Sequence, residues 1–191
     1  MGKTTFALNI AENVAKKGGA VVIFSLEMNK RLLLNRLISS VSEITANKLK
    51  YGNIADAEWS QLSEAMEKLT KMPIYIDDNV DSNAFDIRNK ARNAATMLAN
   101  KGKELKLVVI DYLQLMRGDV KLKDTNTQIA DISRQLKALA RDLNIPVVVL
   151  SQLSRDADKR GVKNSKPVLS DLRDSGAIEQ DADVVMFVWT T

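Results

Sequence analysis

The chain has 191 residues, of which 45% are hydrophobic and 27% charged, the balance of a globular protein rather than a disordered one. It contains no cysteine and no histidine, which excludes disulfides, thiol chemistry, zinc sites built from these residues and histidine-based triads. The formal net charge of +4 permits binding to nucleic acid but is too small to indicate it. No apolar run approaches the roughly 20 residues of a membrane helix, and no export signal is recognisable. We therefore expect a cytoplasmic protein without a membrane partner, whose chemistry uses carboxylates, Lys, Arg, hydroxyls, amides or an oxygen-bound metal.

Helical and strand patterns alternate along the chain. The first half predicts a helix at 3–17, a strand at 20–24, helices capped by Asn29 and by Asp56, and a strand at 73–77. The second half predicts a helix from Ser82 or Asn83 to about Ala99, a strand at 105–110, a polar loop at 117–126, a long helix carrying Ile129 to Leu143, and strands at 146–150 and 184–188. The first helix is expected to carry Phe6, Ile10 and Val14 on one face. Short, continuously apolar strands that alternate with helices indicate an α/β fold with a largely parallel sheet flanked by helices, in a single domain over residues 1–191.

The first motif, Gly2-Lys3-Thr4-Thr5, stands where the first helix is predicted to begin. It matches the second half of the phosphate loop G-x-x-x-x-G-K-[ST], in which the lysine reaches the β and γ phosphates and the hydroxyl of the next residue ligates Mg²⁺. An ordinary helix start with a cap-like threonine is the alternative for these four residues alone. Because no strand is predicted before the motif, we expect the strand that feeds a phosphate loop to be missing.

Three further polar side chains follow predicted strands, namely Glu27, Asp111 and Gln152. Ligands of parallel sheets bind beyond the carboxyl ends of the strands. Asp111 is therefore a candidate for holding Mg²⁺, Glu27 for activating the water that attacks the γ phosphate, and Gln152 for sensing that phosphate. Each residue alone also fits an ordinary loop or cap position, but four such motifs on one sheet edge indicate a nucleoside triphosphatase.

The stretch from 155 to 173 is polar and contains six basic residues with interleaved aspartates. Such a loop on a sheet edge can meet a phosphate backbone, and a solvated loop is the equally plain alternative. No aromatic residue lies among these charges, so the stretch does not indicate base stacking.

Five segments, in this order, resemble the C-terminal ATPase domain of the bacterial and phage replicative DNA helicases of the DnaB family: GKTTFALNIA, FSLEM, VVIDYLQLM, VVVLSQLSR and SDLRDSGAIEQDAD. The resemblance covers essentially the whole chain. It implies a RecA-like P-loop NTPase core, a ring-shaped homohexamer in the full-length parent, and ATP-driven movement on single-stranded DNA. It also implies that the parent protein contacts a primase and a helicase loader.

The resemblance further implies roles for individual residues. Glu27, Lys3 and Gln152 would be catalytic, with Glu27 activating water. ATP would be bound by Gly2, Lys3, Thr4, Thr5 and Asp111, and Mg²⁺ by Thr4 and Asp111. The DNA backbone would be contacted by Arg173, Asp174 and Gly176.

Two parts of the family pattern are not seen in this chain. The first half of the phosphate loop is one, and the later strands that carry an arginine finger and its companion lysine are the other. From the resemblance as a whole, we expect the motor domain of a replicative DNA helicase. A truncated non-catalytic relative, or a RecA/RadA-like recombinase or clock-type ATPase, is the alternative.

Overall fold

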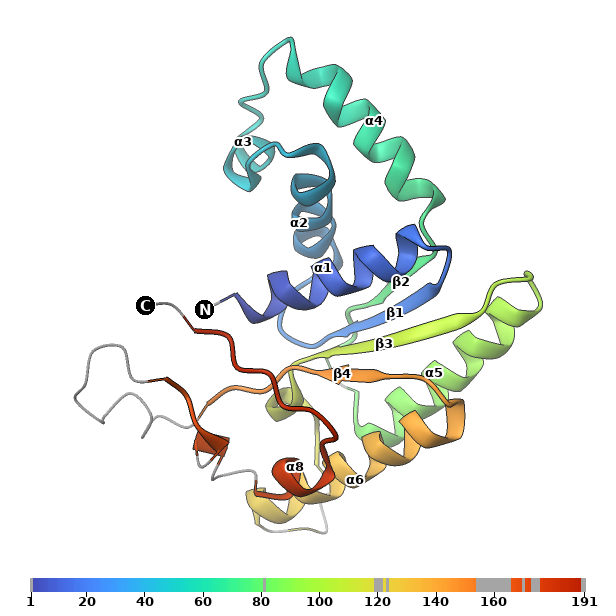
Figure 1. Ribbon diagram of the computed structural model, residues 1–191, viewed down its shortest axis with the longest axis vertical. Helices are drawn as coiled ribbons and strands as arrows, with labels where there is room; N and C mark the ends of the chain where they lie inside the picture. Colours follow the sequence, from blue (N-terminus) through green and yellow to red (C-terminus); the bar gives the residue numbers. More distant parts are fainter. Residues whose placement is uncertain are drawn as a thin grey trace.

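The computed structural model describes residues 2–80, 82–118, 122, 124–153, 166–169, 171–172 and 176–189. The described strands form one parallel sheet in the order β2-β1-β3-β4. Their bounds are Ala20–Ser25 for β1, Ile74–Asp77 for β2, Leu105–Asp111 for β3 and Val147–Val149 for β4. Helices cover both faces of the sheet, with α1 to α4 on one side and α5, α6 and α8 on the other (Figure 1). The predicted α/β fold with a parallel sheet is confirmed.

The central strands are mainly apolar because both faces of the sheet are covered. All six residues of β1 are buried, and its side chains alternate between two hydrophobic cores. Val22 and Phe24 face the layer of α5 and α6, whereas Val21 and Ile23 face α1 and α2. This two-sided burial is the physical reason for the continuous apolar runs in the sequence.

Helix α1 (Lys3–Lys16) lies against the sheet mainly through small residues, and the predicted apolar face is confirmed only in part, because Ile10 and Val14 pack against the core whereas Phe6 does not. Its buried apolar side chains are Ala7, Leu8, Ala11 and Ala15. The alanines recur every four residues and allow the helix backbone to approach β1 and β3 closely. Phe6 remains 40% exposed, because the face that α1 turns to the sheet is centred on these alanines. The prediction centred the face on the larger side chains instead.

Helices α2 (Lys30–Ser42), α3 (Ala46–Tyr51) and α4 (Glu58–Lys71) extend away from the sheet (Figure 1). The predicted cap of α2 is confirmed, since the Asn29 side chain accepts a hydrogen bond from the Leu32 amide. The predicted cap of α4 at Asp56 is wrong. The helix begins at Glu58, so the capping position is Ala57 rather than Asp56. The short helix α3 was not predicted.

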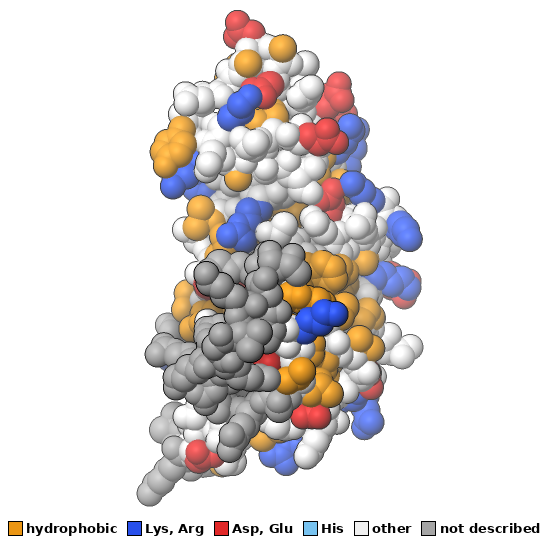
Figure 2. Space-filling view, turned by 60° about the vertical axis from the view of Figure 1, so that its left-hand side comes forward, with side chains coloured by type: hydrophobic (Ala, Val, Ile, Leu, Met, Phe, Trp, Pro, Cys, Tyr) orange, Lys and Arg blue, Asp and Glu red, His pale blue; other side chains and the backbone are white. Residues whose placement is uncertain are grey.

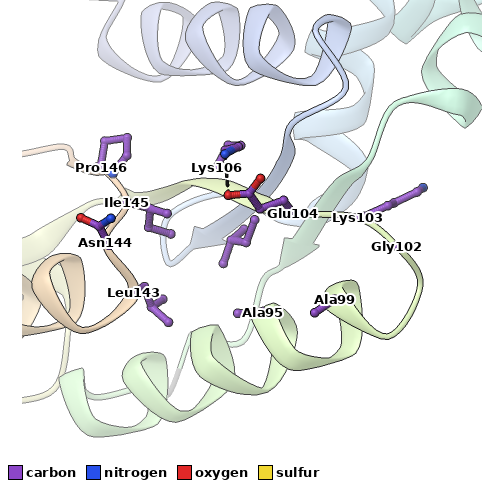
Figure 3. A pocket seen from close by; sticks show the side chains of 11 residues that line it. Ala95, Ala99, Gly102, Lys103, Glu104, Lys106, Leu143, Asn144, Ile145 and Pro146 are labelled. Carbon is purple, nitrogen blue, oxygen red and sulfur yellow. Dashed lines mark ion pairs between the residues drawn. The ribbon is translucent and has the colours of Figure 1, made fainter.

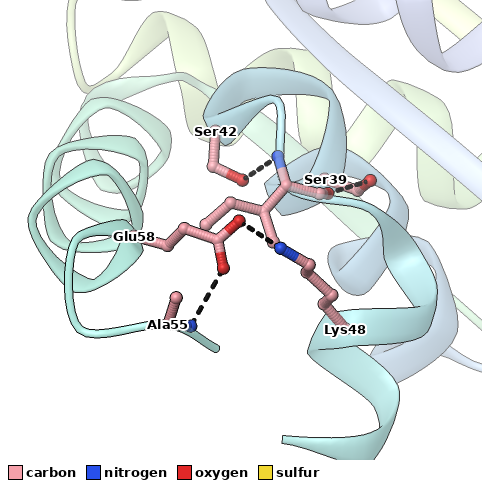
Figure 4. A network of polar contacts seen from close by, with 6 residues as sticks. Ser39, Ser42, Lys48, Ala55 and Glu58 are labelled. Carbon is pink, nitrogen blue, oxygen red and sulfur yellow. Dashed lines mark hydrogen bonds and ion pairs between the residues drawn. The ribbon is translucent and has the colours of Figure 1, made fainter. Parts of the chain in front are cut away.

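Polar contacts hold the turns between these three helices (Figure 4). The Glu58 carboxylate accepts hydrogen bonds from Lys48 Nζ at 2.6 Å and from the Ala55 amide at 3.0 Å. Ile44 is fixed by two serines of α2, with its carbonyl accepting from Ser39 and its amide donating to Ser42. Glu58 thus holds the loop before α4, the helix that Asp56 was expected to cap.

On the opposite face, α5 (Ala84–Ala99) and α6 (Thr125–Leu143) pack side by side, and α8 (Gly176–Asp181) packs on α6. The Asn83 side chain forms a capping box with Asp86, so one of the two predicted start residues of α5 is confirmed. Asp142 near the end of α6 ties the two long helices together, because both Arg88 and Arg92 of α5 donate to its carboxylate.

The expected strand at 184–188 is wrong in this structure. Within the described part of the chain, these residues pair with no other strand, and Val184 and Met186 are 72% and 55% exposed. A strand is defined by hydrogen bonds to a neighbouring backbone, and a continuous run of apolar residues alone does not supply a neighbour. Among the described residues, no helix is long and apolar enough to cross a membrane.

Candidate functional site

The predicted phosphate motif lies at the N-terminus of α1, beside the carboxyl end of β3. Gly2, the residue before the helix, has φ 115°, a backbone conformation that favours glycine. Its carbonyl accepts the Phe6 amide at 2.9 Å, so the first three amides of the helix have no acceptor within it. Thr5 is exposed in this first turn. These N–H groups and the positive end of the helix dipole suit an anion.

The Lys3 side chain contacts the segments that follow β3 and β4. Its Nζ donates to the Ser151 carbonyl at 2.8 Å and lies 5.4 Å from the centroid of the Tyr112 ring. Partial burial lowers the pKa of the Lys3 ammonium below its ordinary value, and the charges of Asp111 and Glu27 oppose this shift. Lys3 therefore lies within electrostatic reach of both predicted carboxylates.

Asp111 ends β3 and is only 2% exposed. Its Oδ2 accepts a hydrogen bond from the Thr4 hydroxyl at 2.7 Å, whereas its buried Oδ1 has no partner. No cluster of three acidic side chains that could hold a metal ion occurs among the residues that the structure describes. Mg²⁺ keeps most of its waters and takes few protein oxygens, so the Thr4 hydroxyl and the unpaired Asp111 oxygen fit such an ion.

Glu27 lies in the turn after β1, and its side chain is exposed. The turn is shaped by Ser25, a buried residue whose hydroxyl donates to the Met28 carbonyl at 2.7 Å and accepts from the Met28 amide at 3.3 Å. The Leu26 amide donates to the Asp111 carbonyl at 2.6 Å, which holds this turn against the end of β3. Sequence reasoning missed Ser25, although it is the polar residue that precedes Leu-Glu-Met in an otherwise apolar strand.

Gln152 is exposed just beyond β4, and its backbone is held by the side chain of Gln114. Gln114 was not predicted as a site residue, although it is the one polar residue within the apolar run Leu113-Gln114-Leu115-Met116.

Of the three residues expected to contact the DNA backbone, the structure describes one. Arg173 and Asp174 lie outside the described residues, and Gly176 is the exposed first residue of α8.

A cavity of ≈ 560 Å³ lies at the opposite end of the sheet (Figure 3). It is bounded by the last turns of α5 and α6 and by the first residues of β3, with Leu143 and Ile145 among its lining residues. Its charged side chains, Lys103, Glu104 and Lys106, are exposed, and Glu104 and Lys106 form an ion pair with each other. Ligands of parallel sheets bind at the carboxyl edge, so the site at Lys3 and Asp111 is the better candidate although it is not enclosed.

The fold and this edge of the sheet define a RecA-like P-loop NTPase core. The parallel sheet, the lysine and threonine at a glycine-led helix N-terminus, and the buried aspartate at the end of a central strand are its elements.

Comparison with known proteins gives the family. Residues 1–191 match the model of the DnaB-like helicase C-terminal domain, and the chain belongs to this family. It is 44% identical over 191 residues to the replicative DNA helicase DnaC of Bacillus subtilis (strain 168) and, equally, to the replicative DNA helicase DnaB of Geobacillus stearothermophilus. Each of these matches covers 99% of this chain but 40% of the relative.

Two of the similar solved structures show the extent of the likeness. One is described as an ATPase domain and superposes with a TM-score of 0.87 at 41% identity, covering 95% of this chain and 63% of that one. The other, a DnaB-like replicative helicase described with its interactions with primase, gives the same TM-score and identity, covering 96% of this chain and 43% of that one. The predicted family and the RecA-like fold are confirmed.

Proposed function

We propose that this chain is the ATP-hydrolysing motor domain of a replicative DNA helicase, which couples hydrolysis to translocation on single-stranded DNA and to duplex unwinding. One observation carries the proposal: Lys3, Thr4 and Asp111 converge at one sheet edge, with the Thr4 hydroxyl 2.7 Å from the Asp111 carboxylate. Membership of the DnaB-like family supports the helicase assignment over a recombinase or a clock-type ATPase.

Each residue has a role that its chemistry allows. The amides that follow Gly2 and the Lys3 ammonium bind the phosphates of ATP and offset their negative charge. The Thr4 hydroxyl and Asp111 hold Mg²⁺, which when bound supplies a counter-charge between the β and γ phosphates. Glu27 accepts the proton of the attacking water, and it lies on the turn built by Ser25, which is held against the end of β3.

The DNA contact is assigned to Arg173, Asp174 and Gly176, with Gln152 reporting the state of the γ phosphate to the segment that precedes them. On the face drawn in Figure 2, basic and acidic side chains are interspersed rather than gathered in one basic patch.

The wider assembly is proposed from the family. The full-length parent would form a homohexameric ring in the cytoplasm and would contact a primase and a helicase loader. The interaction with primase that is described for a similar DnaB-like helicase supports the first of these contacts. The chain spans about 40% of the length of its curated relatives, so these contacts belong to the whole protein.

The test is steady-state ATP hydrolysis by this chain, with and without single-stranded DNA. Lys3→Ala is expected to abolish ATP binding and turnover, whereas Glu27→Gln is expected to keep binding and lose turnover. Lys17→Ala is the matched control, because Lys17 is exposed at the other end of α1. If Lys3→Ala and Lys17→Ala have equal effects, the ATP site is wrong, and the non-catalytic alternative takes its place.

A further inference from the structure

Gln114 forms a side-chain clamp at the predicted ATP site. It lies in the 3-10 turn η1 (Leu113–Leu115), directly after β3. Its Nε2 donates to the Gln152 carbonyl at 3.2 Å, and its Oε1 accepts from the Gln152 amide at 3.2 Å. One primary amide thus bonds both polar groups of a single residue, as a neighbouring strand would.

The clamp begins where the sheet ends. The ladder between β3 and β4 finishes at the pair Ile110 and Val149. Two backbone bonds extend it, from the Leu150 amide to the Ile110 carbonyl and from the Leu113 amide to the Leu150 carbonyl, both at 2.9 Å. Within the described residues, backbone-to-backbone pairing of the two strand exits stops there, and the Gln114 side chain continues it by two residues.

The clamped segment is also the one that Lys3 contacts. Gln114 Nε2 donates to the Ser151 hydroxyl at 2.8 Å, and the carbonyl of the same Ser151 accepts from Lys3 Nζ at 2.8 Å. A short chain of hydrogen bonds therefore joins Gln114, Ser151 and Lys3. Because its members come from three separate segments, it links the exits of β3 and β4 with the start of α1.

We infer that Gln114 is a positioning residue of the ATP site, an inference that rests on the proposed function. It fixes the Gln152 backbone, so that the exposed Gln152 side chain stays at the sheet edge, one residue after the Ser151 carbonyl that Lys3 contacts. The phosphate-binding groups themselves, Lys3, Thr4 and Asp111, do not bond to Gln114 in this structure. Loss of the clamp is therefore expected to lower kcat for ATP and to leave KM within about twofold.

The first experiment measures amide hydrogen exchange in the whole chain, for the wild type, Gln114→Ala and Gln114→Glu. In Gln114→Ala the Gln152 amide is expected to exchange about five- to tenfold faster, which corresponds to the loss of a hydrogen bond of ordinary strength. The Leu150 amide, bonded to the Ile110 carbonyl, is expected to be unchanged. Gln114→Glu keeps an acceptor for the Gln152 amide but no donor, and protection is expected to be intermediate.

The control variant is Gln61→Ala, which removes an exposed glutamine of α4 far from this segment in sequence. Unchanged exchange at Gln152 in Gln114→Ala would overturn the clamp. Equal acceleration at Leu150 and Gln152, with a lower Tm, would also overturn it, because Gln114 would then act on the fold as a whole.

The second experiment compares kcat and KM for ATP in the same variants. A roughly tenfold lower kcat in Gln114→Ala, with KM nearly unchanged, supports the positioning role. A kcat within twofold of the wild type would overturn that role and leave the proposed function standing. Failure of the wild-type chain to bind and hydrolyse ATP would instead remove the proposed function and with it the positioning role, while the exchange data still decide whether Gln114 fixes Gln152.

Discussion

The hydrogen bond between Thr4 and Asp111 yields a stability prediction that needs no nucleotide. Thr4→Val removes the hydroxyl that donates to Asp111 Oδ2 at 2.7 Å and keeps the shape of the side chain. The carboxylate is 2% exposed, and its other oxygen has no partner. Hydrogen bonds to charged groups contribute about 1.5–3 kcal/mol, so we expect the free energy of unfolding to fall by about 2 kcal/mol.

The assay is a double-mutant cycle in urea, comprising the wild type, Thr4→Val, Asp111→Ala and the double variant. Asp111→Ala removes a buried charge as well as a bond, so its own sign is not predicted. The cycle cancels this effect and isolates the coupling between the two residues, which we expect to be about 1.5–3 kcal/mol. Thr70→Val is the matched control, because the Thr70 hydroxyl donates to the Glu67 carbonyl on the exposed surface of α4.

The outcome that would refute this reasoning is a coupling below about 0.5 kcal/mol, the usual error of additivity between independent sites. Thr4 and Asp111 would then not be bonded in solution, and the paired oxygens proposed to hold Mg²⁺ would lose their geometric basis. A loss in Thr70→Val as large as in Thr4→Val would show that the assay reports on any threonine hydroxyl.

Three further predictions concern the DNA contact, the core and acid stability. Arg173→Ala should weaken binding to single-stranded DNA and reduce the salt slope of log K by about 0.7, measured by fluorescence anisotropy at several salt concentrations; an unchanged slope would remove Arg173 from the contact. Leu139→Ala truncates a fully buried side chain of α6 and should cost about 3 kcal/mol in urea unfolding, whereas Leu34→Ala, 39% exposed, should cost well under 1 kcal/mol; similar losses would contradict the packing. Hydrogen bonds from the two arginines of α5 lower the pKa of Asp142, so its stabilising contribution is complete above the unfolded value of about 3.9 and is lost as pH falls through the folded pKa. Asp142→Asn should therefore flatten the acid side of the stability curve below about pH 4, and parallel curves for wild type and variant would contradict this.

Sequence reasoning succeeded where a local pattern has a local cause. The continuous apolar runs marked β1 and β3 because a strand covered on both faces needs no polar side. Asn29 and Asn83 were recognisable as helix starts because a side-chain cap bonds an amide two or three residues away. The residue types at the strand ends were recognisable as well, since a lysine beside a threonine and an aspartate after a buried strand suit phosphates and Mg²⁺.

Sequence reasoning failed where the structure of a segment depends on the neighbouring segments that it packs against or pairs with. The continuous apolar run at 184–188 resembles a buried strand, yet the described residues give it no neighbour to pair with. The helical pattern predicts Phe6 in the core, but the sheet is contacted by the alanines of α1, and no local rule ranks an alanine above a phenylalanine. Asp56 resembles a cap, and Glu58 holds the loop instead.

The sequence by itself determined the family, because five of its segments resemble those of DnaB-like helicases. It also determined the parallel α/β fold and the residue types at the carboxyl edge, because these depend on periodicity and spacing along the chain. Only the tertiary structure decided which groups meet. Thr4 and Asp111 are 107 positions apart, and Lys3 and Ser151 are 148 apart. The Gln114 clamp spans 38 positions and contains no pattern that a sequence window could register. Parallel strands bring such distant segments to one edge through their crossovers, and the contacts made there are set by the register of the sheet rather than by any local preference of the chain.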